Sequence, residues 1–340
     1  RSRMWAYFGL LHYSQTFLAW TFNSHIGGEE QALFGLLDHD SRPSWKVDEF
    51  RRIASEMKTL RGMGFPRYGQ PDVAVHYSFD TNWLTTPPPG PNTMQEYFKG
   101  NYGDQVKAAF APLFEDNIDT AVIDIGHDAI DKYKLVVLSS AYIMDKETAE
   151  AVRNYVAKGG TVIMTGYSAK VDETGKWFET PLPGRLTDVF GLRTNEFYRS
   201  KAPLEIGFDG ATLTGTDPHY EVLELGTAKP LAMFDNTPQK SPAIAINRYG
   251  KGQAIYLATA AQGPFIAPLL RSLYASLGIA RGPQTPAGVV ARVVDGRTLY
   301  VNTNDAPASV TFPGSKTGVL TRRTYSGRID LDPFGVELVQ

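Results

Sequence analysis

The 340-residue chain contains no cysteine. This absence excludes disulfide bonds, thiolate metal sites and a cysteine nucleophile, although it does not decide whether the compartment is reducing or oxidising. The chain also lacks a large excess of positive or negative residues. It has 34 Lys and Arg residues and 36 Asp and Glu residues, so its formal net charge is −2. Without an excess of basic residues, the chain has no net positive charge to attract nucleic acid or an anionic membrane. We therefore expect neither partner.

Long apolar runs and nucleotide-binding motifs are missing as well. No stretch reaches the roughly 20 apolar residues that span a bilayer, and the first residues lack the apolar core of a signal peptide. No Gly-x-Gly-x-x-Gly, P-loop or Gly-x-Ser-x-Gly pattern occurs, so the sequence shows neither a phosphate cradle nor a serine-hydrolase elbow. The six histidines have no metal-ligand spacing. We expect no cofactor and no metal, and we favour the cytoplasm although no motif decides the compartment.

Apolar residues make up 42% of the chain, which is enough for two or three packed cores. Apolar side chains at helical spacing open the sequence, and a β-branched and aromatic run follows them. Ser44 is a plausible N-cap for a second helix that glycines end. The elements predicted in this part are a helix at 1–14, a buried strand at 16–22, a polar loop at 23–30, an extended piece at 32–37 and a helix from Ser44 to Gly62.

From residue 72 the pattern changes to alternating strands and helices. Short strands that are apolar along their whole length belong in a parallel sheet covered by helices. Strand, helix and strand at this spacing form βαβ units, so we predict a doubly wound, flavodoxin-like α/β domain. The strands are predicted at 72–77, 119–125, 135–140 and 161–165, with helices around 106–113 and from 145, and with a proline-rich loop at 87–91.

Beyond residue 175 the periodicity becomes more typical of β-structure. We predict a hairpin whose arms are 243–246 and 253–257, and a helix from Phe265 to Leu277 that closes the domain at Gly278. From about residue 282, several short alternating runs predict a small antiparallel β-sandwich.

The polar cluster after the predicted strand 16–22 is the strongest candidate site. In a (β/α) barrel, loops that follow the strands carry the substrate-binding groups. A carboxylate beside an aromatic surface suits the recognition of sugar hydroxyls. Glu29 and Glu30 are adjacent and point to opposite faces of an extended chain, so together they cannot be the two carboxylates of a glycosidase. A solvated loop with ordinary surface carboxylates is the alternative interpretation. The cluster contains Trp20, Phe22, Asn23, His25, Glu29 and Glu30.

Three stretches of the chain carry a family resemblance. They are Trp5 to His39, the run from Leu135-Val-Val-Leu to Gly159-Gly160-Thr161-Val, and the ending Leu331-Asp-Pro-Phe-Gly-Val-Glu-Leu. In this order they resemble parts of the glycoside hydrolase family 42 β-galactosidases: the last barrel helix with the eighth strand and its loop, the trimerisation domain, and the small β domain. The resemblance implies the tail of a (β/α)8 barrel at 1–66, a flavodoxin-like, amidotransferase-like trimerisation domain at 67–281, and a small β domain at 282–340.

The resemblance also implies an activity and partners. It implies a retaining exo-β-glycosidase that acts on a β-linked oligosaccharide or glycoside and assembles as a homotrimer. The family's two catalytic Glu residues follow the fourth and seventh barrel strands, so we expect both upstream of Arg1, in an N-terminal barrel portion of the same enzyme. We assign no catalytic residue within the chain. The substrate-binding residues that the resemblance implies are Glu30, Trp20, Phe22, Asn23 and His25.

Two positions depart from the family pattern. Phe22 stands where the family usually has a tryptophan, and Leu33 stands where it has a histidine. The missing histidine donor favours a related β-glycoside, with galactose as the default. A non-catalytic oligomerisation or carbohydrate-binding protein on a flavodoxin-like platform is the rival interpretation. Amidotransferase chemistry would need Ser168 in place of the absent cysteine.

Overall fold

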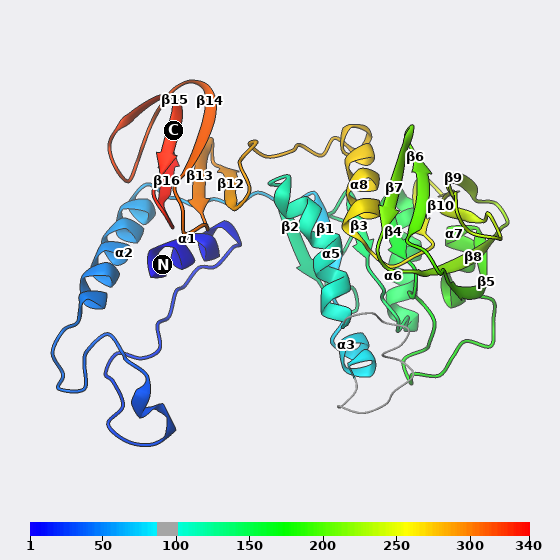
Figure 1. Cartoon of the computed structure of the whole chain (residues 1–340), viewed down its shortest axis with the longest axis horizontal. Helices are drawn as coiled ribbons and strands as arrows, with labels where there is room; N and C mark the ends of the chain where they lie inside the picture. The colour runs from blue at the N-terminus through cyan, green and yellow to red at the C-terminus, as the bar shows by residue number, and fades with distance from the viewer. Residues whose placement is uncertain (87–100) are drawn as a thin grey trace. The chain divides into compact units, whose positions relative to one another are not determined.

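The computed structural model describes residues 1–86 and 101–340 (Figure 1). These residues form two compact units, one containing residues 1–69 and 282–340 and the other containing residues 70–281. The proline-rich loop predicted at 87–91 lies outside the described residues. Within the described ranges, no helix is both long enough and apolar enough to cross a membrane.

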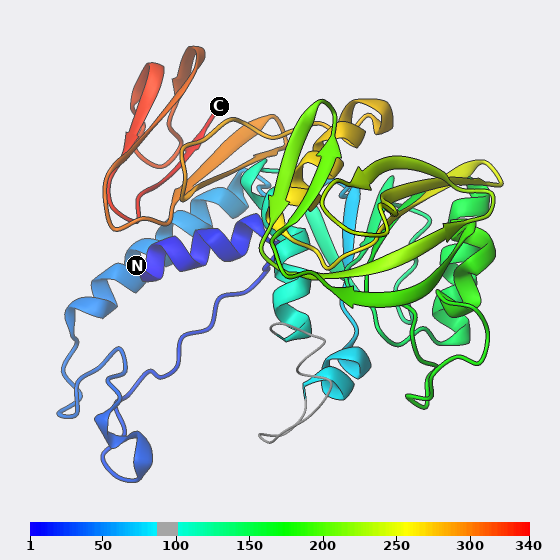
Figure 2. The same ribbon diagram turned by 45° about the vertical axis from the view of Figure 1, so that its right-hand side comes forward.

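The first unit brings the two ends of the chain together. Helices α1 (Ser2–Leu11) and α2 (Trp45–Gly62) contact each other, and α1 also contacts strands of the C-terminal sheets, as Figure 2 shows in blue and orange. Arg3 links the three elements. Its Nε donates a hydrogen bond of 2.7 Å to Glu56 on α2, and its Nη2 donates one of 3.3 Å to the carbonyl of Val336.

The C-terminal strands form two small antiparallel sheets, with the orders β12-β13-β16 and β14-β15. Their apolar side chains share one core that includes Tyr300, Val310 and Ile329. The predicted small antiparallel sheets are confirmed. The strands are β12 (Val289–Val294), β13 (Arg297–Asn302), β14 (Ala308–Thr317), β15 (Thr324–Leu331) and β16 (Val336–Val339).

The second unit is built around a nine-stranded mixed sheet with the order β2-β1-β3-β4-β11-β10-β9-β6-β7. The first five strands are parallel, and each later pair is antiparallel. The strands are β1 (Val73–His76), β2 (Thr120–Ile123), β3 (Leu135–Leu138), β4 (Thr161–Thr165), β6 (Leu204–Phe208), β7 (Ala211–Gly215), β9 (Lys229–Phe234), β10 (Pro242–Tyr249) and β11 (Gly252–Leu257). Strands β5 (Leu192–Arg199) and β8 (His219–Leu225) form a separate antiparallel pair.

The parallel half of this sheet confirms the predicted βαβ pattern. Strands β1, β3 and β4 are buried at every position, as expected where helices cover both faces. Asn101 caps α5 and Asp145 caps α6, each accepting a hydrogen bond from a first-turn N–H. The helices of the unit are α3 (Phe79–Thr85), α5 (Tyr102–Glu115), α6 (Lys146–Lys158), α7 (Thr187–Phe190) and α8 (Gly263–Leu277), with a 3₁₀ turn η2 (Gly184–Leu186).

The sheet is not parallel throughout: the predicted hairpin with arms 243–246 and 253–257 is confirmed as the antiparallel pair β10 and β11, and the parallel βαβ pattern is limited to the first half of the sheet. Two residues connect β6 to β7, and two connect β10 to β11. Such short connections allow only antiparallel neighbours, because a parallel pair needs a crossover of a dozen or more residues. The observed fold of this unit is therefore an α/β mixed fold with a parallel and an antiparallel half.

The buried strand predicted at 16–22 is wrong. Residues 16–22 are irregular, and the side chains of Leu18 and Trp20 are largely exposed. β-Branched and aromatic residues favour a strand only where neighbours take its backbone hydrogen bonds, and no strand of the described ranges lies beside this segment. The extended piece predicted at 32–37 begins one residue later, because Ala32 belongs to the 3₁₀ turn η1 (Glu29–Ala32). Leu33 has an extended backbone, and Leu37 joins isolated bridges.

Candidate functional site

The strongest candidate site is the loop from Trp20 to His39, which brings together three of the predicted sugar-binding residues. Trp20 Nε1 donates a hydrogen bond of 3.2 Å to Glu30 Oε2. His25 Nε2 lies 3.7 Å from the same oxygen. The rings of Trp20 and His25 stack with centroids 5.9 Å apart and planes 28° apart. One carboxylate therefore faces an indole and an imidazole.

This cluster is open to a ligand. The Glu30 side chain is 47% exposed, and Trp20 is 75% exposed. An ionised carboxylate offers about four acceptor positions, so the indole N–H leaves most of them free for hydroxyl groups. The exposed Trp20 ring adds a flat apolar surface beside them. The arrangement can hold a molecule that carries both hydroxyl groups and an apolar face, such as a pyranose ring.

Phe22 and Asn23 take part in the loop through their backbones. The carbonyl of Phe22 accepts a hydrogen bond of 2.8 Å from the N–H of Leu37, and Asn23 pairs with Leu37 in an isolated bridge. The polar contacts described for Glu30 come from Trp20 and His25, and neither the Phe22 nor the Asn23 side chain is among them. Their predicted roles in sugar binding stay predictions.

The loop is closed by Ser24 and Gly35. The buried Ser24 hydroxyl donates to the Leu37 carbonyl at 2.7 Å and accepts from the Gly35 N–H at 2.9 Å. A Cβ atom at Gly35 would lie 2.7 Å from the carbonyl oxygen of Thr21 and 2.9 Å from that of Phe22. Only glycine allows this approach. Sequence reasoning missed Ser24, because its partners lie more than ten residues away and leave no local pattern.

The start of α2 anchors the same loop. Ser44 accepts from the N–H of Lys46 at 3.3 Å, which confirms the predicted N-cap, and its hydroxyl donates to the Leu36 carbonyl at 2.9 Å. The Lys46 ammonium donates to the carbonyls of Phe34 and Gly35 at 2.9 and 3.0 Å. The start of the helix thus holds residues 34–36 of the loop.

Ser168, the residue that amidotransferase chemistry would need, is buried, and its hydroxyl already takes part in a hydrogen bond. Its hydroxyl accepts a hydrogen bond of 3.0 Å from the Ala141 N–H. Close by, the Lys170 ammonium lies 3.0 Å from a Glu221 carboxylate oxygen, and both side chains are 1% exposed. Burial lowers the pKa of Lys170, and the Glu221 carboxylate opposes that change. A buried serine beside a buried ion pair has no access to substrate, so the structure does not support amidotransferase chemistry there.

Metal chemistry finds no support in the described residues either. In residues 1–86 and 101–340, no group of three His, Asp or Glu side chains could hold a metal ion.

Comparison with known proteins places the chain in a family. A family model described as the β-galactosidase trimerisation domain matches residues 71–280. This chain belongs to that family. Among curated relatives, the β-galactosidase LacZ of Heyndrickxia coagulans is 25% identical over 350 residues, which cover 99% of this chain and 51% of the relative. The β-galactosidase BglY of Alicyclobacillus acidocaldarius is 27% identical over 286 residues, covering 79% of this chain and 40% of the relative.

Solved structures agree on the fold. A β-galactosidase from Bacillus circulans sp. alkalophilus superposes with a TM-score of 0.86 at 24% identity, covering 99% of this chain and 51% of that chain. A catalytic mutant of Gan42B, a β-galactosidase of glycoside hydrolase family 42 from G. stearothermophilus, superposes with a TM-score of 0.87 at 22% identity, covering 99% of this chain and 50% of that chain. The chain spans about half the length of the relatives it matches, and it corresponds to the C-terminal portion of family 42 β-galactosidases.

Gly35→Ala is expected to loosen the loop, because the added Cβ overlaps two carbonyl oxygens that hold it closed. The N–H groups of Leu36 and Leu37 donate to those carbonyls, so their hydrogen exchange reports the opening directly. We expect exchange at least about tenfold faster, equivalent to a loss of ~1.4 kcal/mol. Gly27→Ala is the matched control, since a Cβ there meets nothing within 4 Å. Equal exchange in both variants would contradict this account of the loop.

Proposed function

We propose that this chain forms the C-terminal portion of a retaining exo-β-glycosidase that removes terminal β-linked sugars, with β-galactosides as the default substrate. The observation that carries the proposal is the cluster of Glu30, Trp20 and His25 in a chain that belongs to a β-galactosidase domain family. Hydrolysis would proceed by double displacement between two Glu residues supplied by an N-terminal barrel portion. The role of this chain would be to bind and orient the sugar.

Glu30 is the centre of the proposed sugar site. One of its oxygens is held by the Trp20 N–H at 3.2 Å, which fixes the carboxylate before a ligand arrives. Its free lone pairs would accept hydrogen bonds from the hydroxyls of the terminal sugar. Hydrogen bonds to a charged group contribute about 1.5–3 kcal/mol each. The exposed Trp20 ring would lie against the apolar face of the same sugar.

The proposed barrel tail at residues 1–66 is supported by its uncovered apolar side chains. Single exposed apolar residues are normal on a protein surface, but a concentration of large ones marks an interface. A neighbouring barrel strand would also supply backbone hydrogen-bond partners to residues 16–20, which precede the two carbonyls that Leu36 and Leu37 already engage. The exposed side chains are Trp5, Phe17, Leu18, Trp20, Phe22, Ile26, Leu33, Phe34 and Trp45.

We also propose that residues 67–281 hold the enzyme together as a homotrimer. Apolar side chains gather near the carboxyl ends of the parallel strands. On α3, Phe79 is 58% and Trp83 is 70% exposed, with ring centroids 5.9 Å apart. Leu84 lies against Gly175, which places α3 beside the segment that carries the exposed Trp177. We name Phe79, Trp83, Leu84 and Trp177 the aromatic surface. Its proposed occupant is a second copy of this chain, because the family model for this unit describes a trimerisation domain.

A non-catalytic, sugar-binding or oligomerisation protein is the second candidate function. The observation that favours it is the set of described contacts of Glu30, which contains Trp20 and His25 and no second carboxylate. Such a site can bind a sugar without cleaving it, whereas hydrolysis requires two carboxyl groups that flank one bond.

Glu30→Gln in the enzyme that includes the barrel is expected to lower kcat/KM on 4-nitrophenyl β-galactoside about ten- to a hundredfold, because charged hydrogen bonds to the sugar become neutral ones. Glu29→Gln is the control, since Glu29 belongs to the same 3₁₀ turn and is also exposed. Its kcat/KM should change less than about threefold. A Glu30→Gln enzyme with unchanged kcat/KM would show that Glu30 does not bind the sugar.

Light scattering at micromolar concentration tests the aromatic surface. The unaltered chain should have the mass of a trimer, and the double variant Phe79→Ser/Trp83→Ser should dissociate, because each serine removes a large apolar contact. Leu231→Ser removes an exposed apolar side chain from β9 and should leave the trimer intact. A monomeric unaltered chain would refute the trimer, and an intact trimer in the double variant would refute this surface.

A further inference from the structure

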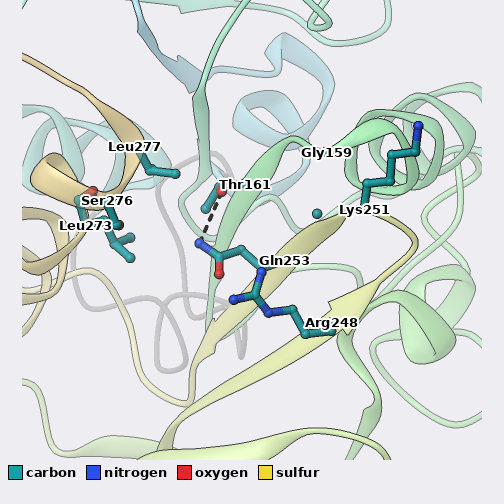
Figure 3. A pocket seen from close by; sticks show the side chains of 9 residues that line it. Gly159, Thr161, Arg248, Lys251, Gln253, Leu273, Ser276 and Leu277 are labelled. Atoms are coloured by element: carbon teal, nitrogen blue, oxygen red, sulfur yellow. Dashed lines mark hydrogen bonds between the residues drawn. The ribbon is translucent and has the colours of Figure 1, made fainter.

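A cavity of about 290 Å³ opens where strands β4 and β11 begin (Figure 3). It lies within residues 70–281, and the sugar site described above does not include it. The end of α6, the turn between β10 and β11, and the last turns of α8 line it. In an α/β sheet the opposite edge, at the carboxyl ends of the strands, is the usual place for a ligand. The chemistry of this cavity therefore has to be argued from its own residues.

The charged side chains that line the cavity are both cationic. Arg248 lies near the end of β10 and Lys251 in the turn that follows it, and no Asp or Glu is among the lining residues. Neither cation forms an ion pair with a described residue, and both side chains are exposed. Figure 3 shows the Arg248 guanidinium directed toward the side chain of Gln253. Two unpaired cations at one opening favour an anionic ligand.

At the C-terminal end of helix α6, which borders the cavity, backbone carbonyls already accept hydrogen bonds from a neighbouring segment of the chain. The carbonyl of Ala157 accepts from the N–H of Lys251 at 2.9 Å. The carbonyl of Gly160, just after the helix, accepts from the N–H of Gln253 at 3.2 Å. Donors from the turn thus satisfy the acceptors that would otherwise face a bound anion.

The hairpin of β10 and β11, which carries the two cations, has a sterically constrained turn. Gly250 has a φ of +58°, in the left-handed region that favours glycine. A Cβ at Gly252 would lie 2.3 Å from backbone carbonyl oxygens of the α6 end. Gln253 Nε2 donates a hydrogen bond of 3.2 Å to the Thr161 hydroxyl, which holds the amide in place. A site whose backbone is fixed before binding loses less entropy when the ligand arrives.

We propose that this cavity binds a small phosphorylated molecule of the sugar monophosphate class. Arg248 and Lys251 would hold the phosphate, since a guanidinium donates two parallel hydrogen bonds to phosphate oxygens and an ammonium adds a second charge. Gln253 and Ser276 offer polar groups to hydroxyls, and Leu277 contributes apolar surface to the wall. A cavity of this size is at the lower end of small-molecule sites, which suits a monosaccharide rather than a nucleotide. The proposal does not depend on the glycosidase activity.

Calorimetric titration of the 340-residue chain with inorganic phosphate and with a hexose monophosphate tests the proposal. Sodium chloride keeps the ionic strength constant, so general screening does not mimic binding. We expect saturable binding at one site per chain. The double variant Arg248→Gln/Lys251→Gln should bind at least about tenfold more weakly, because it loses the charged donors. Both side chains are exposed, so the variant is expected to keep the Tm of the parent chain.

The matched control is Lys146→Gln/Arg199→Gln, which removes two exposed cations elsewhere in the same unit. Its affinity for phosphate should equal that of the unaltered chain. Tighter binding of the hexose monophosphate than of inorganic phosphate supports the sugar part of the proposal, and equal affinity overturns that part. Absence of binding, full binding by the Arg248→Gln/Lys251→Gln variant, or equal binding of the unphosphorylated hexose overturns the phosphate site.

Discussion

Backbone contact between residues 21–24 and 35–37 determines where Glu30 can lie. The N–H groups of Leu36 and Leu37 donate across this contact, and the buried Ser24 hydroxyl joins both sides. Gly35 permits the approach because any Cβ would meet two carbonyl oxygens. The loop between these segments has little regular structure of its own, so the placement of Glu30 beside Trp20 and His25 depends on this contact. The proposed sugar site depends on it.

In the second unit, β11 pairs in parallel with β4 and antiparallel with β10. This change divides the sheet into a parallel half and an antiparallel half. The parallel strands are covered on both faces and carry helices, and the exposed aromatic side chains gather near their carboxyl ends. The hairpin of β10 and β11 instead projects a glycine-rich turn against the end of α6, which creates the basic cavity. One mixed sheet thus carries both the proposed subunit surface and the proposed anion site.

The sequence predicted the elements whose signals are local. Ser44 marked the start of α2, and apolar strands separated by capped helices predicted the parallel half of the sheet. The prediction of a strand at 16–22 was wrong because residue composition does not show whether a partner strand is present. Ser24 was missed because its hydrogen bonds join residues 11 and 13 positions away. The polar cluster and the family resemblance together pointed to Trp20, His25 and Glu30, whose side chains the structure brings together, whereas Phe22 and Asn23 contribute described contacts through their backbones.

The central claim is that this chain binds the sugar, while the carboxylates that cleave the bond belong to an N-terminal barrel portion. Hydrolysis of 4-nitrophenyl β-galactoside by the 340-residue chain, compared with the enzyme that includes the barrel at equal concentration, tests this claim most directly. The account predicts rapid hydrolysis by the larger protein and none above background by the 340-residue chain, because hydrolysis needs two flanking carboxyl groups. Hydrolysis by the 340-residue chain alone would contradict it.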